Sequence, residues 1–281
     1  MYNFDLISDI HLDFWVKHDI NNNKLDTRMD EFIEKILPEE CQKVLVIAGD
    51  LGHYERQNKL FLQKMKEFYK NIILVVGNHD YYLVSSMIKK KYNRQSINRI
   101  KELKKIAKEI ENVHLLDGEI IEIDGIKYGG VGMWYDFSYG EKILGASNER
   151  IYTLWWNIMN DNNFIYPIDI KISLDIFKLE KEKLKSIIDR SDVIITHINP
   201  NWSKLPYKYQ EDLTTSFYTF DGSEFFNKIN GKVWCYGHTH ERIDYDEYGC
   251  RFINAALGYP EENSTKIKKI ENISSELGWK D

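Results

Sequence analysis

The sequence predicts an α/β fold in which a parallel sheet is followed by a second sheet. Short runs rich in Val, Ile and aromatic residues, typical of buried strands, alternate with segments whose apolar residues recur at helical spacing. Alternating strands and helices build parallel sheets, because each helix carries the chain back across the sheet. Two hairpin patterns later in the chain indicate further strands and favour packing of one sheet on another.

The predicted elements follow one another in a regular order. Helices are predicted before Pro38, where apolar residues from Met29 to Leu37 share one face, and again from Leu60 to Phe68. A helix at residues 97–110, a strand at 113–116 and a hairpin at 120–130 follow, and we interpret them as the start of the second sheet. A last hairpin turns near Tyr248-Gly249 and returns through 251–254. The buried strands are predicted at residues 4–8, 44–48, 72–76, 193–196 and 233–236.

An insertion-like aromatic segment, residues 134–167, interrupts this order. Five of its residues have helical spacing, which favours core or lid packing: Ile151, Leu154, Trp155, Ile158 and Met159. Other aromatic side chains, Tyr135 and Tyr139 first, are expected to be exposed, where stacking on a base or aryl group is the alternative to packing. We treat residues 1–281 as one domain that contains this insertion.

Composition excludes several classes of protein. Three cysteines form no C-x-x-C pair and no even disulfide framework, which favours a reducing cytoplasm. The first residues lack a leader pattern and no apolar run is long enough for a membrane span, so we expect a soluble protein without a membrane partner. A net charge of −6 argues against non-specific nucleic-acid binding.

Five short polar segments each follow one of the predicted strands. Parallel strands gather such residues at the carboxyl ends of a sheet, so we expect the segments to converge. Each alone is weakly specific, since polar turns are common, but five of the eight histidines lie in them. Carboxylate, amide and imidazole donors suit Mn²⁺, Fe²⁺ and Zn²⁺, and two such ions about 3.5–4 Å apart promote in-line attack on phosphorus. The segments are Asp9-Ile10-His11, Gly49-Asp50, Gly77-Asn78-His79-Asp80, Thr196-His197 and Gly237-His238-Thr239-His240.

In order, spacing and residue type, these segments resemble the calcineurin-like metallophosphoesterase superfamily, whose pattern is D-x-H, GD, GN-H-[DE], a lone H and G-H-x-H. The resemblance runs from Ile7 to about Pro260. It implies a four-layer αββα sandwich of two mixed β-sheets, of the metallo-dependent phosphatase type. It also implies two divalent metal ions, Mn²⁺ first, with Fe, Zn or Ni as alternatives, and a metal-bridging hydroxide that attacks phosphorus.

The resemblance also assigns the site residues. It implies that Asp50 bridges the two ions, and that His79 protonates the leaving group or orients the substrate. Asp80 is expected either to fix the His79 tautomer through a hydrogen bond or to cap the turn. His53 is expected to line the mouth of the site. The ligands of the first ion are Asp9, His11, Asp50 and His240, and those of the second are Asp50, Asn78, His197 and His238.

The expected substrate is a phosphorylated small molecule or nucleotide, as a phosphomonoester or phosphodiester. The chain departs from the protein-phosphatase pattern G-D-x-x-D-R-G, because the text after Asp50 is Leu51-Gly52-His53-Tyr54-Glu55 and lacks the phosphate-clamping Arg. The alternatives are a nuclease of the same superfamily, which is not favoured without a DNA-binding extension, and a non-catalytic protein-binding scaffold. Residues 89–108 hold nine Lys/Arg and one Glu, which form either a basic lip or the solvated face of a helix. No protein partner is predicted.

Overall fold

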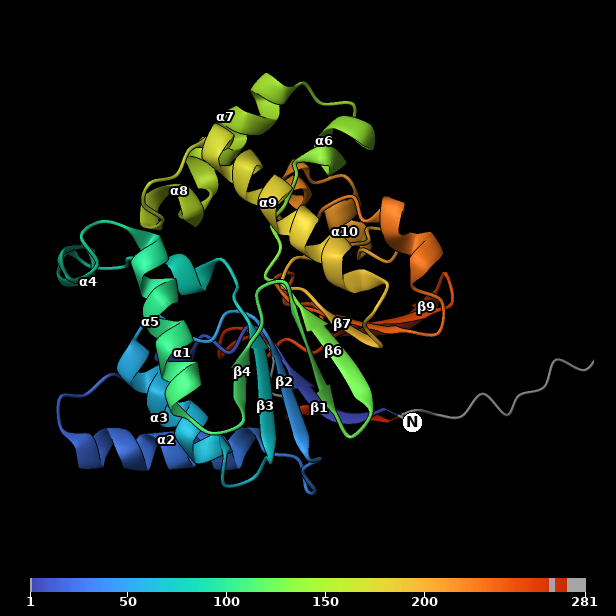
Figure 1. Cartoon of the computed structure of the whole chain (residues 1–281). Helices are drawn as coiled ribbons and strands as arrows, with labels where there is room; N and C mark the ends of the chain where they lie inside the picture. The colour runs from blue at the N-terminus through green and yellow to red at the C-terminus, as the bar shows by residue number, and fades with distance from the viewer. Residues whose placement is uncertain (1, 263–265, 272–281) are drawn as a thin grey trace, which may run out of the picture.

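The computed structural model describes residues 2–262 and 266–271, in which two mixed β-sheets face each other with helices outside (Figure 1). The first sheet has the order β11-β1-β2-β3-β4. Strands β1 to β4 are parallel, and β11 pairs antiparallel with β1. These strands are β1 (Asn3–Ile7), β2 (Val44–Ala48), β3 (Asn71–Val75), β4 (Val113–Leu115) and β11 (Lys268–Glu271).

The second sheet has the order β5-β6-β7-β8-β10-β9. Its central strands β6, β7, β8 and β10 run parallel, and antiparallel hairpin partners β5 and β9 form its edges. The expected hairpins at 120–130 and around Tyr248-Gly249 are therefore confirmed. The strands are β5 (Glu119–Ile123), β6 (Ile126–Gly130), β7 (Val193–Ile195), β8 (Val233–Tyr236), β9 (Ile243–Glu247) and β10 (Cys250–Asn254).

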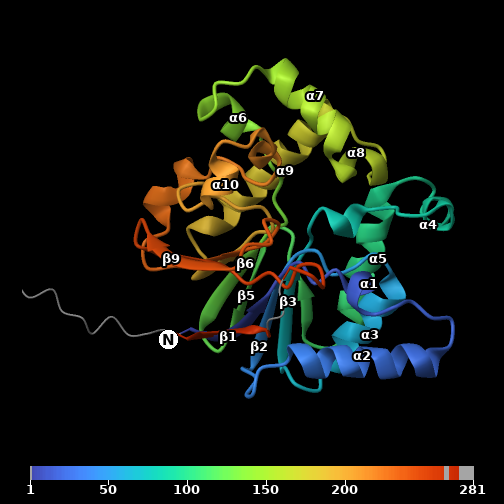
Figure 2. The ribbon, with the colours of Figure 1, turned by 180° about the vertical axis from the view of Figure 1, so that it is seen from behind.

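Helices cover the outer face of each sheet, as the two opposite views show (Figures 1 and 2). Apolar side chains of α2 (Asn22–Ile36), α3 (Glu55–Met65) and α5 (Ser96–Glu109) pack on the first sheet, and those of α9 (Ile170–Ile188) pack on the second. The remaining helices are α1 (Leu12–Trp15), α4 (Ser86–Lys91), α6 (Ser138–Lys142), α7 (Asn148–Ile158), α8 (Asn160–Phe164) and α10 (Tyr207–Gln210). Short 3₁₀ turns are η1 (His79–Tyr81), η2 (Leu213–Phe217) and η3 (Ser223–Lys228).

A separate apolar core fills the space between the two sheets. Phe4 of β1 meets Tyr128 of β6 edge to face, with ring centroids 5.9 Å apart. Val46 and Val75 from the first sheet join Val193 and Cys235 from the second in the same buried cluster. Side chains of successive strand residues point to opposite faces, so each sheet contributes to this core and to an outer one. The αββα arrangement is therefore confirmed.

Two expectations about individual segments are wrong. The strand at 113–116 belongs to the first sheet as its edge strand β4, whereas the second sheet begins with the hairpin. The expected exposure of Tyr135 and Tyr139 is the second, because these side chains are only 0% and 3% exposed. Burial is tolerated because the Tyr135 hydroxyl donates to Asp161 and the Tyr139 hydroxyl donates to the Gln210 carbonyl. Within the described ranges, no helix is long and apolar enough to cross a membrane.

Candidate metal centre

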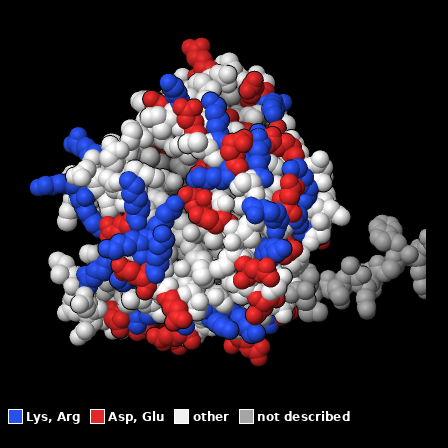
Figure 3. Space-filling view, viewed as in Figure 1, with Lys and Arg blue, Asp and Glu red and all other residues white. Residues whose placement is uncertain are grey.

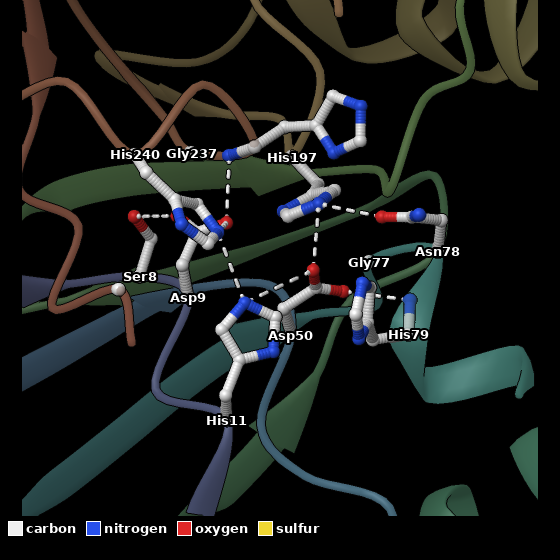
Figure 4. A network of polar contacts seen from close by, with 12 residues as sticks. Ser8, Asp9, His11, Asp50, Gly77, Asn78, His79, His197, Gly237 and His240 are labelled. Carbon is white, nitrogen blue, oxygen red and sulfur yellow. Dashed lines mark hydrogen bonds and ion pairs between the residues drawn. The ribbon is translucent and has the colours of Figure 1, made fainter. Parts of the chain in front are cut away.

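The five polar segments meet where strands of both sheets end. Segments after β1, β2 and β3 supply Asp9, His11, Asp50 and the Asn78 turn, while those after β7 and β8 supply the remaining histidines (Figure 4). The backbone is unusual here, because five of the expected ligands have positive φ values of 46–67°: Asp9, His11, Asp50, His238 and His240. The left-handed conformation costs roughly 1–2 kcal/mol per non-glycine residue, and such strain collects at functional sites.

Asp9, His11 and His240 form one side of the centre. The His11 and His240 Nε2 atoms are 3.0 Å apart, and His240 Nε2 lies 3.5 Å from Asp9 Oδ1. The Asp9 carboxylate is itself held by the Ser8 hydroxyl and by the His238 backbone N–H, at 2.6 and 2.8 Å. Their potential ligand atoms lie within 4.8 Å of one another.

Asp50, Asn78, His197 and His238 form the other side. His197 Nε2 lies 3.2 Å from Asn78 Oδ1 and 3.4 Å from Asp50 Oδ2. The same Asp50 oxygen is 3.8 Å from His11 Nε2, so this carboxylate stands between the two sides (Figure 4). The His79 backbone N–H donates to Asp50 Oδ1 at 2.9 Å and fixes its orientation.

This donor set fits divalent cations. His197 Nδ1 bonds the Ala48 carbonyl at 2.9 Å, and His238 Nε2 bonds the Phe217 carbonyl at 2.9 Å, so each donates one N–H and keeps the other nitrogen as a lone pair. His240 Nδ1 contacts Glu262 Oε2 at 2.6 Å in the same way. Lone pairs on facing imidazoles repel each other unless a cation or a proton lies between them. Together with the carboxylate and amide oxygens, these nitrogens form a ligand set that suits borderline divalent ions.

The protonation of the metal-free centre reflects burial and the Asp50 charge. Burial lowers the pKa of His11 to about 4 and that of His238 to about 3. Burial also acts on His197, but the Asp50 carboxylate outweighs it and raises the pKa of His197 to about 9. Burial raises the pKa of Asp50, yet the adjoining His197 and His79 hold it well below its ordinary range. Without metal, the centre thus combines the Asp50 carboxylate and a protonated His197 with neutral His11 and His238 side chains.

His79 is held by a chain of side chains that sequence reasoning missed. Its Nδ1 lies 3.1 Å from His53 Nε2, and His53 Nδ1 lies 2.8 Å from Asp13 Oδ2. The Asp13 carboxylate must accept from His53 Nδ1–H, so His53 Nε2 accepts from His79 Nδ1–H. His53 was expected only at the mouth of the site. His79 also belongs to a third set of residues that could hold a metal ion. Its potential ligand atom lies within 4.8 Å of those of His11 and Asp50.

Asp80 takes the second of its two expected roles. Its carboxylate accepts from the backbone N–H groups of Gly77, Asp50 and Leu51 at 2.8–3.2 Å. Within the described chain its hydrogen bonds end there, and none reaches the His79 ring, which corrects the expected tautomer-fixing contact. The reason is geometric: the Asp80 side chain turns back under the loop, where burial raises its pKa to about 6. Asp80 therefore joins the loops that carry Asp50 and His79.

Arg99 is a further buried residue behind these loops. It is fully buried, pairs with Glu55 at 2.8 Å and donates to the carbonyls of His79, Tyr82 and Gly52. The sequence analysis counted it among the basic residues of 89–108, as part of a basic lip or of a solvated helix face. The signal that sequence reasoning missed is its spacing: Arg99 lies four residues before Leu103, which places it on the buried face of α5.

Two motif glycines are required by close approach. A Cβ at Gly49 would collide with the His197 ring, and Gly49 also has φ +88°. A Cβ at Gly77 would collide with the Asp50 carboxylate and backbone N. Only glycine leaves space for these side chains. The glycines of the Gly-Asp and Gly-Asn motifs are therefore needed for close packing of the ligands, and not only for turns.

A cavity of about 570 Å³ opens beside the centre. Its walls include His79 and His238 from the centre, Ile158 and Met159 from the aromatic segment, and Lys204 from the loop before α10. No residue of 89–108 lines it, so of the two alternatives for this run the structure favours the solvated helix face over a basic lip. The Lys and Arg side chains of the run gather over α4 and α5 (Figure 3). Several are paired there with acids, as in Lys91–Glu102 and Lys104–Asp117.

Comparisons with known proteins identify the class. The family model described as calcineurin-like phosphoesterase matches residues 2–242. The chain therefore belongs to this metal-dependent family, as its resemblance implied. Uncharacterized protein L509 of Acanthamoeba polyphaga mimivirus is 28% identical over 235 residues, 78% of this chain and 80% of that protein.

A solved structure with a TM-score above 0.5 shares the fold. The phosphopantetheinyl hydrolase PptH from Mycobacterium tuberculosis matches with a TM-score of 0.66 and 17% identity over 95% of both chains. The protein TT1561 of Thermus thermophilus matches with a TM-score of 0.48 and 9% identity, covering 96% of this chain and 98% of its own.

Proposed function

We propose that this protein is a binuclear metal-dependent phosphoesterase that hydrolyses a small phosphomonoester, phosphodiester or nucleotide. The proposal depends on one observation. Three groups of potential ligands, which share His11 and Asp50, lie together where strands of both sheets end. Asp9, His11, Asp50 and His240 would hold one ion, and Asp50, Asn78, His197 and His238 the other. Two divalent ions bound there would supply positive charge for a phosphoryl group and hydroxide near neutral pH.

The chain's own residues then orient the substrate and move one proton. We propose that His79, at the cavity wall, protonates the leaving oxygen, while His53 and Asp13 hold its ring in place. Burial lowers the pKa of His79 well below its ordinary value, so the free ring is neutral. An anionic phosphoester beside the ring raises that pKa again, so the proton is taken up as the substrate binds.

The cavity favours a small substrate over a polymer. Its volume of about 570 Å³ lies in the range of small-molecule sites, about 300–1,000 Å³. Lys204 supplies positive charge for an anionic ester, whereas Lys208 is already paired with Glu241 at 2.8 Å. Tyr209 and Tyr218 supply aromatic surface for the leaving group. Free cysteines at Cys41, Cys235 and Cys250 agree with a cytoplasmic location, which we retain as a proposal.

The test is a substrate panel on chelator-treated protein with Mn²⁺ added back. We expect hydrolysis of p-nitrophenyl phosphate, bis-p-nitrophenyl phosphate or both, and the ratio of rates separates monoesterase from diesterase. A nucleotide and a phosphopantetheinyl ester complete the panel. The second is included because the similar solved structure PptH is a phosphopantetheinyl hydrolase. The matched control is Asp50→Asn, in which shape is kept and charge is removed. Bound metal without turnover of any ester would favour a protein-binding scaffold instead.

A further inference from the structure

The aromatic segment reaches the proposed metal centre through one buried carboxylate. Asp161, on α8, is fully buried. Its Oδ1 accepts from Asn78 Nδ2 at 2.8 Å and from the Tyr82 hydroxyl at 2.6 Å, and its Oδ2 accepts from the Tyr135 hydroxyl at 2.6 Å. Asn78 is one of the expected ligands. The aromatic segment therefore contacts the centre through a hydrogen bond to this ligand.

In each of its hydrogen bonds within this network, Asp161 is the acceptor. The Tyr135 hydroxyl receives the Trp155 indole N–H at 2.7 Å and therefore passes its own hydrogen to Asp161. The Tyr82 hydroxyl receives from Asn78 Nδ2 at 3.1 Å and does the same. Both oxygens of Asp161 therefore act as acceptors in this network.

This arrangement decides which way the Asn78 amide points. Because both contacts of Nδ2 are acceptors, Oδ1 must face the opposite direction, where it lies 3.2 Å from His197 Nε2. The two ends of an amide have almost the same shape, so packing alone does not fix the choice. A flipped amide would present N–H donors, which cannot bind a cation.

Asp161 lies behind the centre, where burial raises the pKa of its carboxyl group. Its recorded partners are hydroxyl and amide groups, and none of the ion pairs in the described ranges includes it. A buried carboxylate without a cation is costly. A divalent ion on the far side of the Asn78 amide would provide the missing positive charge.

We propose that Asp161 is a positioning residue of the metal centre, which holds Asn78 Oδ1 toward the ion shared with His197 and His238. The inference rests on the proposed binuclear centre and extends it to the insertion. The segment for which the sequence left core and lid packing open thereby becomes part of the support of one metal site.

The experiment is a calorimetric titration of the chelator-treated full-length protein with Mn²⁺, with bound metal counted by elemental analysis. We expect wild type to bind two ions. Asp161→Asn should keep one affinity and weaken the other by about 10–100-fold, the usual effect of losing a partner behind a ligand. The matched control is Asp136→Asn, because Asp136 also lies in the aromatic segment and also accepts hydrogen bonds, from Ser138 and Asp221, away from the centre. This control should bind both ions as wild type does.

A double-mutant cycle shows whether Asp161 acts through Asn78. If it does, Asp161→Asn combined with Asn78→Ala should bind the weakened ion no worse than Asn78→Ala alone. Additive losses, or wild-type affinity for both ions in Asp161→Asn, would overturn the proposal. If circular dichroism shows that Asp161→Asn is unfolded, Tyr135→Phe replaces it, since this change removes one donor to the carboxylate and keeps the ring. Unchanged metal affinity in that folded variant also contradicts the proposal.

The same titration separates this inference from the proposed function. A wild-type protein that binds no metal would remove the metal centre itself. Two ions bound by wild type and by the Asp161 variant, with equal affinities, would leave the centre in place and reject only the role of Asp161.

Discussion

Three histidines of the centre each commit one ring nitrogen to an acceptor outside it. His197 and His238 donate to carbonyls, and His240 contacts Glu262. Partners of this kind fix the tautomer and raise the basicity of the opposite nitrogen. The sequence predicted the histidines from their motifs, but it contained no sign of these partners, because Ala48 and Phe217 act through backbone carbonyls that any residue would supply.

Asp50→Asn tests the bridging role. The carboxamide keeps the shape but removes the charge between the two sides of the centre, so we expect bound metal and hydrolysis to fall together. The loss of turnover should exceed the roughly 10–100-fold effect of changing a partner behind a ligand. Elemental analysis and p-nitrophenyl phosphate turnover measure both, with Asp136→Asn as the control. Two bound ions and near wild-type turnover would remove Asp50 from this position.

His79→Ala tests the proposed acid. We expect a loss of about 10²–10⁴-fold on an alkyl phosphoester and a much smaller loss on a p-nitrophenyl ester, because p-nitrophenolate leaves without a proton. Rates are compared at saturating Mn²⁺, and His114→Ala, on β4, is the control. Equal losses on both esters would indicate that His79 positions the phosphate. Recovery with excess Mn²⁺ would make it a metal ligand, as its grouping with His11 and Asp50 allows.

At the scale of elements, periodicity found most strands and the helices α2, α3, α5 and α7, because burial of one face dictates the spacing of apolar residues. The longest helix, α9, was not predicted. Periodicity could not place residues whose environment depends on distant partners. Tyr135 looks like an exposed aromatic until Asp161, 26 positions later, accepts its hydroxyl. Arg99 shares the helical spacing of the apolar face of α5, but the spacing could not show that Glu55 of α3 would pair with it there.

Arg99→Met tests how α5 supports the loops beneath the centre. Removing one partner of a buried ion pair leaves Glu55 without its cation and takes a donor from three backbone carbonyls, of which those of Gly52 and His79 keep a second donor. We expect a loss of about 3–5 kcal/mol in the free energy of unfolding. Urea denaturation of the metal-free protein measures it, and Lys101→Met on the exposed side of the same helix should change stability by about 0.5 kcal/mol or less. A cost as small as that of Lys101→Met would show that Arg99 is not needed to hold these loops.

Tyr218→Ala tests the cavity wall after η2. Tyr218 lines the cavity, is 36% exposed and lies with its ring centroid 5.0 Å from that of His238. Because aromatic surface contacts only large leaving groups, KM should rise for aryl or nucleotide esters and change little for a small alkyl phosphate. Steady-state kinetics on the two substrates decide the matter. An equal change for both would indicate a packing defect.

At the scale of the whole molecule, the proposed ligands join the two sheets. Asp9, Asp50 and Asn78 follow strands of the first sheet, and His197 and His238 follow strands of the second. The convergence was predictable because each motif follows a strand. The division between two sheets was implied only by resemblance, since no local pattern reveals which strands pair across long distances in the chain.

Chelation should therefore lower the stability of the entire protein. One ion at 100 times its dissociation constant stabilises the folded state by about 2.7 kcal/mol. For a chain of this size that corresponds to a fall in Tm of roughly 5–10 °C for each ion removed. Thermal melts with chelator, and again after Mn²⁺ is restored, measure the change. Asp50→Asn should show a much smaller difference, and an unchanged wild-type Tm would argue against metal binding.

The order of the ligands along the chain has a consequence for synthesis on the ribosome. Asp9 and Asp50 emerge early, whereas His238 and His240 emerge only when most of the 281 residues have been made. Neither proposed site has its full set of donors until β8 and the turn after it have been translated. Strands β1 to β4 are therefore made before the ions can be retained, so metal loading is expected to be a late event in the maturation of this protein.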